Sequence, residues 1–230
     1  MTVADTADYL PFVLRGIYVT IALSVCSLLV ATALGLIGAW AKLSRFSAVR
    51  GAAETYTTLV RGVPDLVLML LLYYGGQAVV NRIGDATGLW NRAELDPFTV
   101  AVAAIGVIFG SYMTETFRGA YRSIPRGQGE AGKALGLNGW FLFRLVIWPQ
   151  LMRNAMPSFT NNWLSLMKTT ALASVMGLED IVNKANSAGR ATHQPFMFIG
   201  VVLIIYLGLT IVSDVGLRFL ARRLRVAEAV

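Results

Sequence analysis

The chain has 230 residues, of which 56% are hydrophobic and 14% are charged, and its mean hydropathy is +0.60. Soluble domains average about 25% charged residues, so this composition excludes an ordinary soluble protein and indicates a membrane protein. A net charge of +7 in a soluble protein would suggest a nucleic-acid partner, but here basic loops facing an anionic membrane surface account for it without nucleic acid.

Five segments have the length and apolar composition of transmembrane helices, which need about 20 mostly apolar residues. They are 16–41, 57–80, 97–114, 154–178 and 195–213. We interpret the first as a retained span, because its apolar run far exceeds the ~7–15 residues of a signal peptide. The expected fold is therefore a single all-α membrane domain over residues 1–230, with five transmembrane helices.

Basic residues predict the orientation of these spans. With the amino terminus outside, the inner regions 42–65, 115–153 and 214–230 hold 14 lysines and arginines, whereas the outer regions hold 5. Because cytoplasmic loops carry the excess of basic residues, we expect a periplasmic amino terminus and a cytoplasmic carboxyl terminus. The polar loop 115–153 is then cytoplasmic.

The second span opens with Arg61, Pro64 and Asp65, which would form a flexible entrance on the cytoplasmic side. Arg61 and Asp65 can partly neutralise each other. The alternative is an arginine that snorkels to the interface above a helix started by proline. At the end of the third span, Glu115 and Arg118 are three residues apart and can pair on a helix. As part of a gate at the cytoplasmic entrance, they would fix the angle at which the loop leaves the membrane. The alternative is that they contact the substrate directly.

The loop between the third and fourth spans contains two short predicted helices. The first covers 128–135 and ends at Gly136, because glycine adopts the left-handed conformation of a helix end at no cost. The second covers 139–148, is capped by Asn138, and would be stopped or kinked by Pro149. The first helix has small residues that would let another protein's backbone approach. We therefore expect a docking element at the membrane surface, formed by Gln128, Glu130, Ala131, Gly132, Ala134, Leu135, Gly136 and Pro149.

The fourth span carries several polar groups at membrane depth. An intramembrane lysine costs ~2.5–3.5 kcal/mol on insertion scales and usually faces a cavity or a partner. These residues would line a substrate path, or they would serve as hydrogen-bonding contacts between helices. They are Asn161, Trp163, Ser165, Lys168 and Thr169.

Glu179 and Asp180 follow the fourth span, at its predicted outer mouth. Two carboxylates there would favour a cationic substrate by simple electrostatics. The alternative is a pair of solvated loop acids. The sequence has one cysteine, Cys26, and one histidine, His193, so it offers no internal disulfide and no Cys/His metal site. No phosphate-binding loop or catalytic set is present, which predicts a protein that is not an enzyme.

The loop resembles the EAA loop of permeases of bacterial type I ABC importers. The pattern of that family is Glu-Ala-Ala, three residues, Gly, nine residues, Ile, one residue and Leu-Pro. Here Glu130, Ala131, Gly136 and Pro149 match in the same spacing, and Gln128 also fits. The sequence departs from the pattern where Gly132 replaces the second alanine, Val146 replaces isoleucine and Trp148 replaces leucine.

The resemblance extends over nearly the full length and is strongest to the Q-type permeases of histidine, lysine, arginine and ornithine importers. Residues 61–75 are similar to the equivalent stretch in those importers, and Lys168, Thr169 and Leu172 resemble a motif of polar amino-acid permeases. It implies the type I importer permease fold in a bacterial inner membrane, with transport by alternating access. It also implies a second permease chain, two ABC ATPase chains that bind ATP and Mg²⁺, and a periplasmic amino-acid-binding protein. No cofactor is expected on this chain.

Two other functions remain open from the sequence. The cargo could be an opine or another polar amino acid. The chain could also be a membrane scaffold that recruits a cytoplasmic protein without transporting anything. A scaffold would not need Asn161 or Lys168 at membrane depth, so these residues favour transport.

Overall fold

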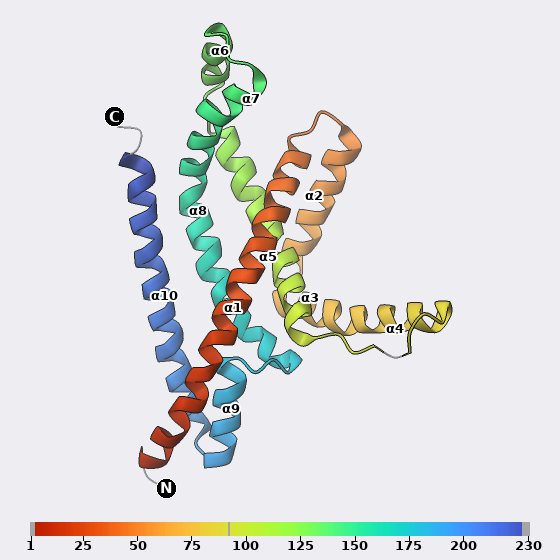
Figure 1. Ribbon diagram of the computed structural model, residues 1–230, viewed down its shortest axis with the longest axis vertical. Coiled ribbons are helices and arrows are strands. Elements are labelled where there is room, and N and C mark those ends of the chain that lie inside the picture. Colours follow the sequence, from red (N-terminus) through yellow and green to blue (C-terminus); the bar gives the residue numbers. More distant parts are fainter. Residues whose placement is uncertain (1–2, 92, 227–230) are drawn as a thin grey trace.

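The computed structural model describes residues 3–91 and 93–226, and these contain only helices and the turns that connect them (Figure 1). Arg92, which was counted among the outer basic residues, lies outside the described residues. The longest helices are α1 (Val3–Lys42), α5 (Pro97–Arg122), α8 (Trp148–Thr169) and α10 (Pro195–Val226). The shorter elements are α2 (Ser47–Gly62), α3 (Asp65–Leu70), η1 (Leu71–Gly75), α4 (Gly76–Thr87), α6 (Arg126–Ala134), α7 (Gly139–Leu142), η2 (Phe143–Ile147), η3 (Thr170–Met176) and α9 (Ile181–Thr192).

Helices α1 and α5 form the centre of the fold because small residues let them approach closely. A Cβ atom on Gly35 would lie 2.3 Å from Met113 Cβ, and one on Gly38 would lie 2.2 Å from Thr114 Oγ1. From the other side, a Cβ atom on Gly106 would lie 2.5 Å from Val30 Cγ1. The larger apolar cluster therefore forms along this contact, and α8 packs against it.

Four helices are long and apolar enough to cross a membrane: Asp8–Lys42, Asp65–Thr87, Pro97–Arg122 and Pro195–Phe219. They overlap the first, second, third and fifth expected spans, and three of them are longer than expected. The fourth expected span is helical, as α8 followed by η3, but it does not meet the same criterion. Its amides and Lys168 lower its hydropathy. A count of five membrane crossings therefore stays a prediction.

The second span differs most from its expected bounds. The range 57–80 joins parts of two separate helices, because α2 ends at Gly62 and a new helix starts at Asp65. Val63 is extended, with φ −114° and ψ 140°, as the residue before a proline prefers. From Asp65 the helix continues without a break to Thr87, and its α4 end points sideways away from the other helices (Figure 1).

Pro149 does not stop the second loop helix, so of the two expected effects, a stop or a kink, the stop is wrong. The helical path from Gly139 continues through α7 and η2 into α8 and ends only at Met176. Proline is tolerated at the second residue of α8, and the preceding π-helical turn Phe143–Ile147 accommodates the change in the hydrogen-bond ladder.

The two ends of the molecule differ in what they carry. At one end α6 and α7 project beyond the long helices, and the last turns of α10 lie toward the same end (Figure 1). At the opposite end α9 lies beside the beginning of α1 (Figure 1). A second apolar cluster joins α1, α9 and α10 there, through Val13, Ile181 and Phe198.

Candidate coupling loop and substrate path

Gly136 follows the end of helix α6, as the sequence predicts. The helix itself covers Arg126–Ala134, so it begins two residues and ends one residue before the expected range 128–135. Gly136 has a φ of +78°, in the left-handed region. Its N–H donates to the carbonyl of Lys133 at 2.9 Å, and the N–H of Leu137 donates to the carbonyl of Gly132 at 3.0 Å. These two bonds satisfy carbonyls that a helix end would otherwise leave free. Asn138 then caps α7, since its Oδ1 accepts from the N–H of Phe141 at 3.1 Å.

The outer surface of α6 is open. Glu130, Ala131 and Ala134 are exposed, and the side chain of Leu135 is 82% exposed. Gly132 alone among the docking residues is buried, because Leu142 packs over it: a Cβ atom there would lie 2.3 Å from Leu142 Cδ1. The replacement of alanine by glycine at position 132 thus allows α6 and α7 to pack closely. It leaves the exposed surface of α6 unchanged.

Two side-chain contacts fasten the loop to the long helices. Gln150 Nε2 on α8 donates to Gln128 Oε1 on α6 at 3.4 Å. Asn154 Nδ2 on α8 donates to the hydroxyl of Ser123, at the end of α5, at 2.8 Å. A cavity of about 670 Å³, lined in part by Glu130 and Lys133, lies between the end of α5 and α6. A force applied to α6 would therefore reach α5 and α8 through these contacts.

Glu115 is the centre of a charge network near the coupling end of α5. It pairs with Arg118, as predicted, through Nε of Arg118 at 2.9 Å from its Oε2. Its other oxygen, Oε1, accepts from Lys42 Nζ at 2.5 Å. Lys42 also pairs with Glu54 of α2 at 2.9 Å, so three helices meet at these charges. Lys42 and Glu54 were not among the predicted site residues, because their contacts join distant parts of the chain.

A polar cavity of about 300 Å³ adjoins this network. Its walls come from α2, α5 and α8, so it lies where these helices face one another. It is lined by Arg61, Tyr112, Glu115, Thr116, Ser158, Asn161 and Asn162. Asn162 Nδ2 donates to Thr116 Oγ1 at 2.9 Å, which ties α8 to α5 at one wall.

Arg61 does not pair with Asp65, which corrects the expected neutralisation. Its guanidinium carbon instead lies 5.1 Å from the centre of the Tyr112 ring, in a cation–π contact with α5. Asp65 lies in the first turn of α3, where a negative charge complements the helix dipole. The break between α2 and α3 separates the two charges.

Polar residues form a stripe along one face of α8. They recur at intervals of three and four residues, which places them on the same side of a helix. All of them are exposed in the isolated chain. They are Asn154, Ser158, Asn161, Ser165 and Lys168. Trp163 lies off this face and packs against the core, and Thr169 is half-buried, so the stripe holds three of the five predicted path residues of this helix.

The two predicted carboxylates at the outer mouth do not form a pair of exposed acids. Asp180 is fully buried and caps α9, where its Oδ1 accepts from the N–H of Asn183 at 2.8 Å. Glu179 is exposed but pairs with Lys184 at 2.8 Å, and this contact lowers the pKa of its carboxyl. Within residues 3–91 and 93–226 no group of three histidine, cysteine or acidic side chains could hold a metal ion.

Comparisons with known proteins agree on one family. Residues 31–226 match the model of the binding-protein-dependent transport system inner membrane component. The chain is 44% identical over 214 residues to the histidine/lysine/arginine/ornithine transport system permease protein HisQ of Escherichia coli K12, covering 93% of each. It is 36% identical to the octopine transport system permease protein OccQ of Rhizobium radiobacter, covering 87% of this chain and 84% of the relative. A crystal structure of an amino acid ABC transporter with histidines matches with a TM-score of 0.82 and 27% identity, covering 97% of this chain and 100% of that one.

Proposed function

Because this chain belongs to the family of inner membrane components of binding-protein-dependent transport systems, and is a transport subunit rather than an enzyme, we propose that it imports basic amino acids. The cargo is arginine, lysine, histidine or ornithine, moved from the periplasm to the cytoplasm by alternating access. The similarity to HisQ over almost the whole chain supports this class of cargo.

The partners follow from the same assignment. Two ABC ATPase chains bind ATP with Mg²⁺, and one of them docks on α6 from the cytoplasm. A second permease, a related but different chain, completes the membrane path, and a periplasmic amino-acid-binding protein delivers the substrate. In this arrangement the amino terminus is periplasmic and the carboxyl terminus cytoplasmic.

The exposed α6 helix carries the proposal. Gly136 forms its end and Gln128, near its beginning, contacts Gln150 on α8, while its small side chains remain open. A partner that binds α6 differently in two nucleotide states would move α5 and α8 together. Such differential contacts are what couple two distant sites.

The substrate path runs along the polar stripe of α8 and the cavity beside Glu115. Arg61 at the cavity wall suits the carboxylate that every amino acid carries. Amides of Asn161 and Asn162 can hydrogen-bond both ends of a zwitterion. Glu115 is already paired with two cations, so it contributes little to attracting a basic side chain. Selection of the cargo then depends mainly on the binding protein.

The test is reconstitution of the whole transporter. The chain is co-expressed with its neighbouring permease, ATPase and binding-protein genes, purified, and placed in proteoliposomes. We expect arginine or histidine with the binding protein to stimulate ATP hydrolysis, and glutamine to leave it unchanged. Stimulation by octopine but not by arginine would replace the proposed cargo with an opine, which the 36% identity to OccQ makes the second candidate. Failure to recover any ATPase chain would contradict the importer and favour a scaffold.

A further inference from the structure

A groove of about 670 Å³ lies at the coupling end of the molecule, on the side of α1 opposite the charge network. Its walls are the end of α1, the end of α5 and the segment where η2 enters α8. Apolar and aromatic side chains make up most of these walls. They include Leu36, Trp40, Leu43, Tyr121, Phe143 and Trp148. Ligand pockets usually measure ~300–1,000 Å³, so the groove has the size of a binding site.

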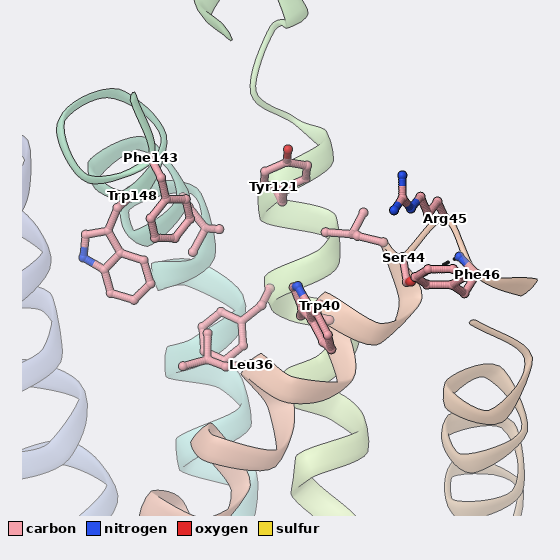
Figure 2. Close-up of a pocket in the computed structure, with 12 residues that line it drawn as sticks. Leu36, Trp40, Ser44, Arg45, Phe46, Tyr121, Phe143 and Trp148 are labelled. Carbon is pink, nitrogen blue, oxygen red and sulfur yellow. Dashed lines mark hydrogen bonds between the residues drawn. The ribbon is translucent and has the colours of Figure 1, made fainter. Parts of the chain in front are cut away.

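Polar groups gather along one rim of the groove. Figure 2 shows the guanidinium of Arg45 and the hydroxyl of Tyr121 toward one side, whereas Leu36 lies on the opposite side. Arg45 contacts the ring of Phe46 at 5.1 Å and forms no ion pair with any side chain in the described parts of the chain. The groove is therefore apolar along its length and positively charged at one end.

This pattern matches the position of the groove in the membrane. The uncharged stretch of α1 ends at Ala41, and the coupling loop begins beyond Arg122, so the groove lies where the apolar helices emerge from the bilayer. Tryptophan and tyrosine concentrate at this level of membrane proteins. Trp40 is 73% exposed, while its neighbour Lys42 is 4% exposed on the other side of α1. The groove thus opens away from the protein interior.

We propose that this groove binds an anionic phospholipid, with an acyl chain against Trp40, Phe143 and Trp148 and the phosphate on Arg45. A cation above an apolar channel is complementary to a lipid with a charged head group, and basic groups near an anionic leaflet gain ~1 kcal/mol each. The leaflet is the cytoplasmic one, and that part of the proposal rests on the orientation given under the proposed function.

The bound lipid would link two parts of the coupling machinery. Phe143 and Trp148 belong to the helical path that continues from the loop into α8, whereas Trp40 belongs to α1. An acyl chain between them packs against both, so it would resist relative movement of the loop and α1. The bound lipid would therefore act as a structural partner of the loop, in addition to being part of the surrounding bilayer.

The experiment uses brominated lipids, which quench tryptophan fluorescence on contact. The complete transporter is placed in nanodiscs of phosphatidylcholine with increasing fractions of phosphatidylglycerol brominated on its acyl chains, and then with brominated phosphatidylcholine instead. We expect half-maximal quenching at a fraction of phosphatidylglycerol about fivefold lower than that of phosphatidylcholine. The quenching that is selective for phosphatidylglycerol should fall in Trp40→Phe and disappear when Trp148→Phe is added, because both tryptophans line the groove. Trp90→Phe, on the loop after α4, should retain it.

The charge is tested with Arg45→Gln, which should abolish the preference for phosphatidylglycerol. Arg82→Gln removes one positive charge from the exposed surface of α4, and this variant should retain the preference for phosphatidylglycerol. Equal quenching by both lipids in the wild type would identify ordinary bilayer lipid and overturn the proposal. Absence of quenching at Trp40 would show that a protein chain fills the groove, and would also overturn it. Neither fluorescence measurement depends on transport, so its outcome is independent of whether the proposed cargo is correct.

Discussion

Lys42 Nζ lies 2.5 Å from Glu115 Oε1, although 73 residues separate them, and the side chain of Lys42 is only 2% exposed. Removing one partner of a buried pair leaves the other charge without compensation. We expect Glu115→Gln to lower the free energy of unfolding by about 1–3 kcal/mol, because Lys42 would keep only Glu54. Thermal unfolding of the purified permease complex measures this.

The matched control is Glu54→Gln. The side chain of Glu54 is 65% exposed, and exposed ion pairs contribute only about 0–1 kcal/mol. A loss of stability as large as that of Glu115→Gln would contradict the central role of Glu115.

Gly136 gives a second prediction, about the end of α6. Its φ of +78° suits only glycine well, and space is not limiting, since no atom lies within 4 Å of an added Cβ. Gly136→Ala should cost about 1–2 kcal/mol of local stability. Amide hydrogen exchange of residues 126–137 should therefore accelerate, and substrate uptake should fall.

Gly129 supplies the control for that experiment. It lies inside α6, also with open space around its Cα. Alanine is a better helix former than glycine by ~0.5–1 kcal/mol, so Gly129→Ala should slow the same exchange. If Gly136→Ala left exchange unchanged, the end of α6 would not depend on the left-handed glycine.

Glu130 provides a third prediction, about docking. It is exposed on α6 and forms no ion pair with any other described side chain. Glu130→Arg should reduce ATPase binding and uptake by tenfold or more, corresponding to at least ~1.4 kcal/mol. Co-purification of the ATPase measures binding. Glu94→Arg makes the same change in charge in the exposed loop after α4 and should leave both unaffected. Equal losses in the two variants would point to net charge rather than docking.

Local features of this fold were predictable from sequence, and long-range ones were not. Gly136 and the Glu115–Arg118 pair depend on residues within a few positions of each other. The Lys42–Glu115 pair depends on how α1 packs against α5, which no local pattern reveals. The second span was misplaced because its apolar run continues past Pro64, where the chain turns.

The burial of Asp180 is another feature that the sequence alone did not predict. Two adjacent acids after a span suggested an exposed outer mouth, but α9 packs against α1 and α10 and buries one of them. Burial raises the pKa of Asp180 to about 6, whereas the exposed Glu179 has its pKa lowered by Lys184. Neighbouring carboxyls thus shift in opposite directions for reasons that only the packing explains.

The last prediction concerns this carboxyl and pH. The pKa of Asp180 is about 6 in the folded protein, above the ordinary 3.8 of an aspartate, so the folded state binds the proton more tightly. Stability should therefore fall as the pH rises from about 4 to about 6 and then level off. A shift of about two pKa units corresponds to at most ~3 kcal/mol. Asp180→Asn keeps an acceptor at the helix cap but cannot ionise, so it should be more stable than the wild type at pH 7.

Thermal unfolding of wild type and Asp180→Asn between pH 4 and pH 8 tests this. The difference between the two curves isolates Asp180 from the other acids, and it should grow from pH 4 to pH 6. Asp96, which caps α5, is a control whose pKa shifts in the opposite direction. Its contacts with Thr99 lower its pKa. Its carboxylate therefore stabilises the fold at higher pH, and that stabilisation is lost as the pH falls through the folded pKa. Asp96→Asn should therefore be less stable than the wild type at pH 7. If Asp180→Asn were also less stable at pH 7, the buried carboxyl would gain more from contacts of its ionised form than it loses by leaving water.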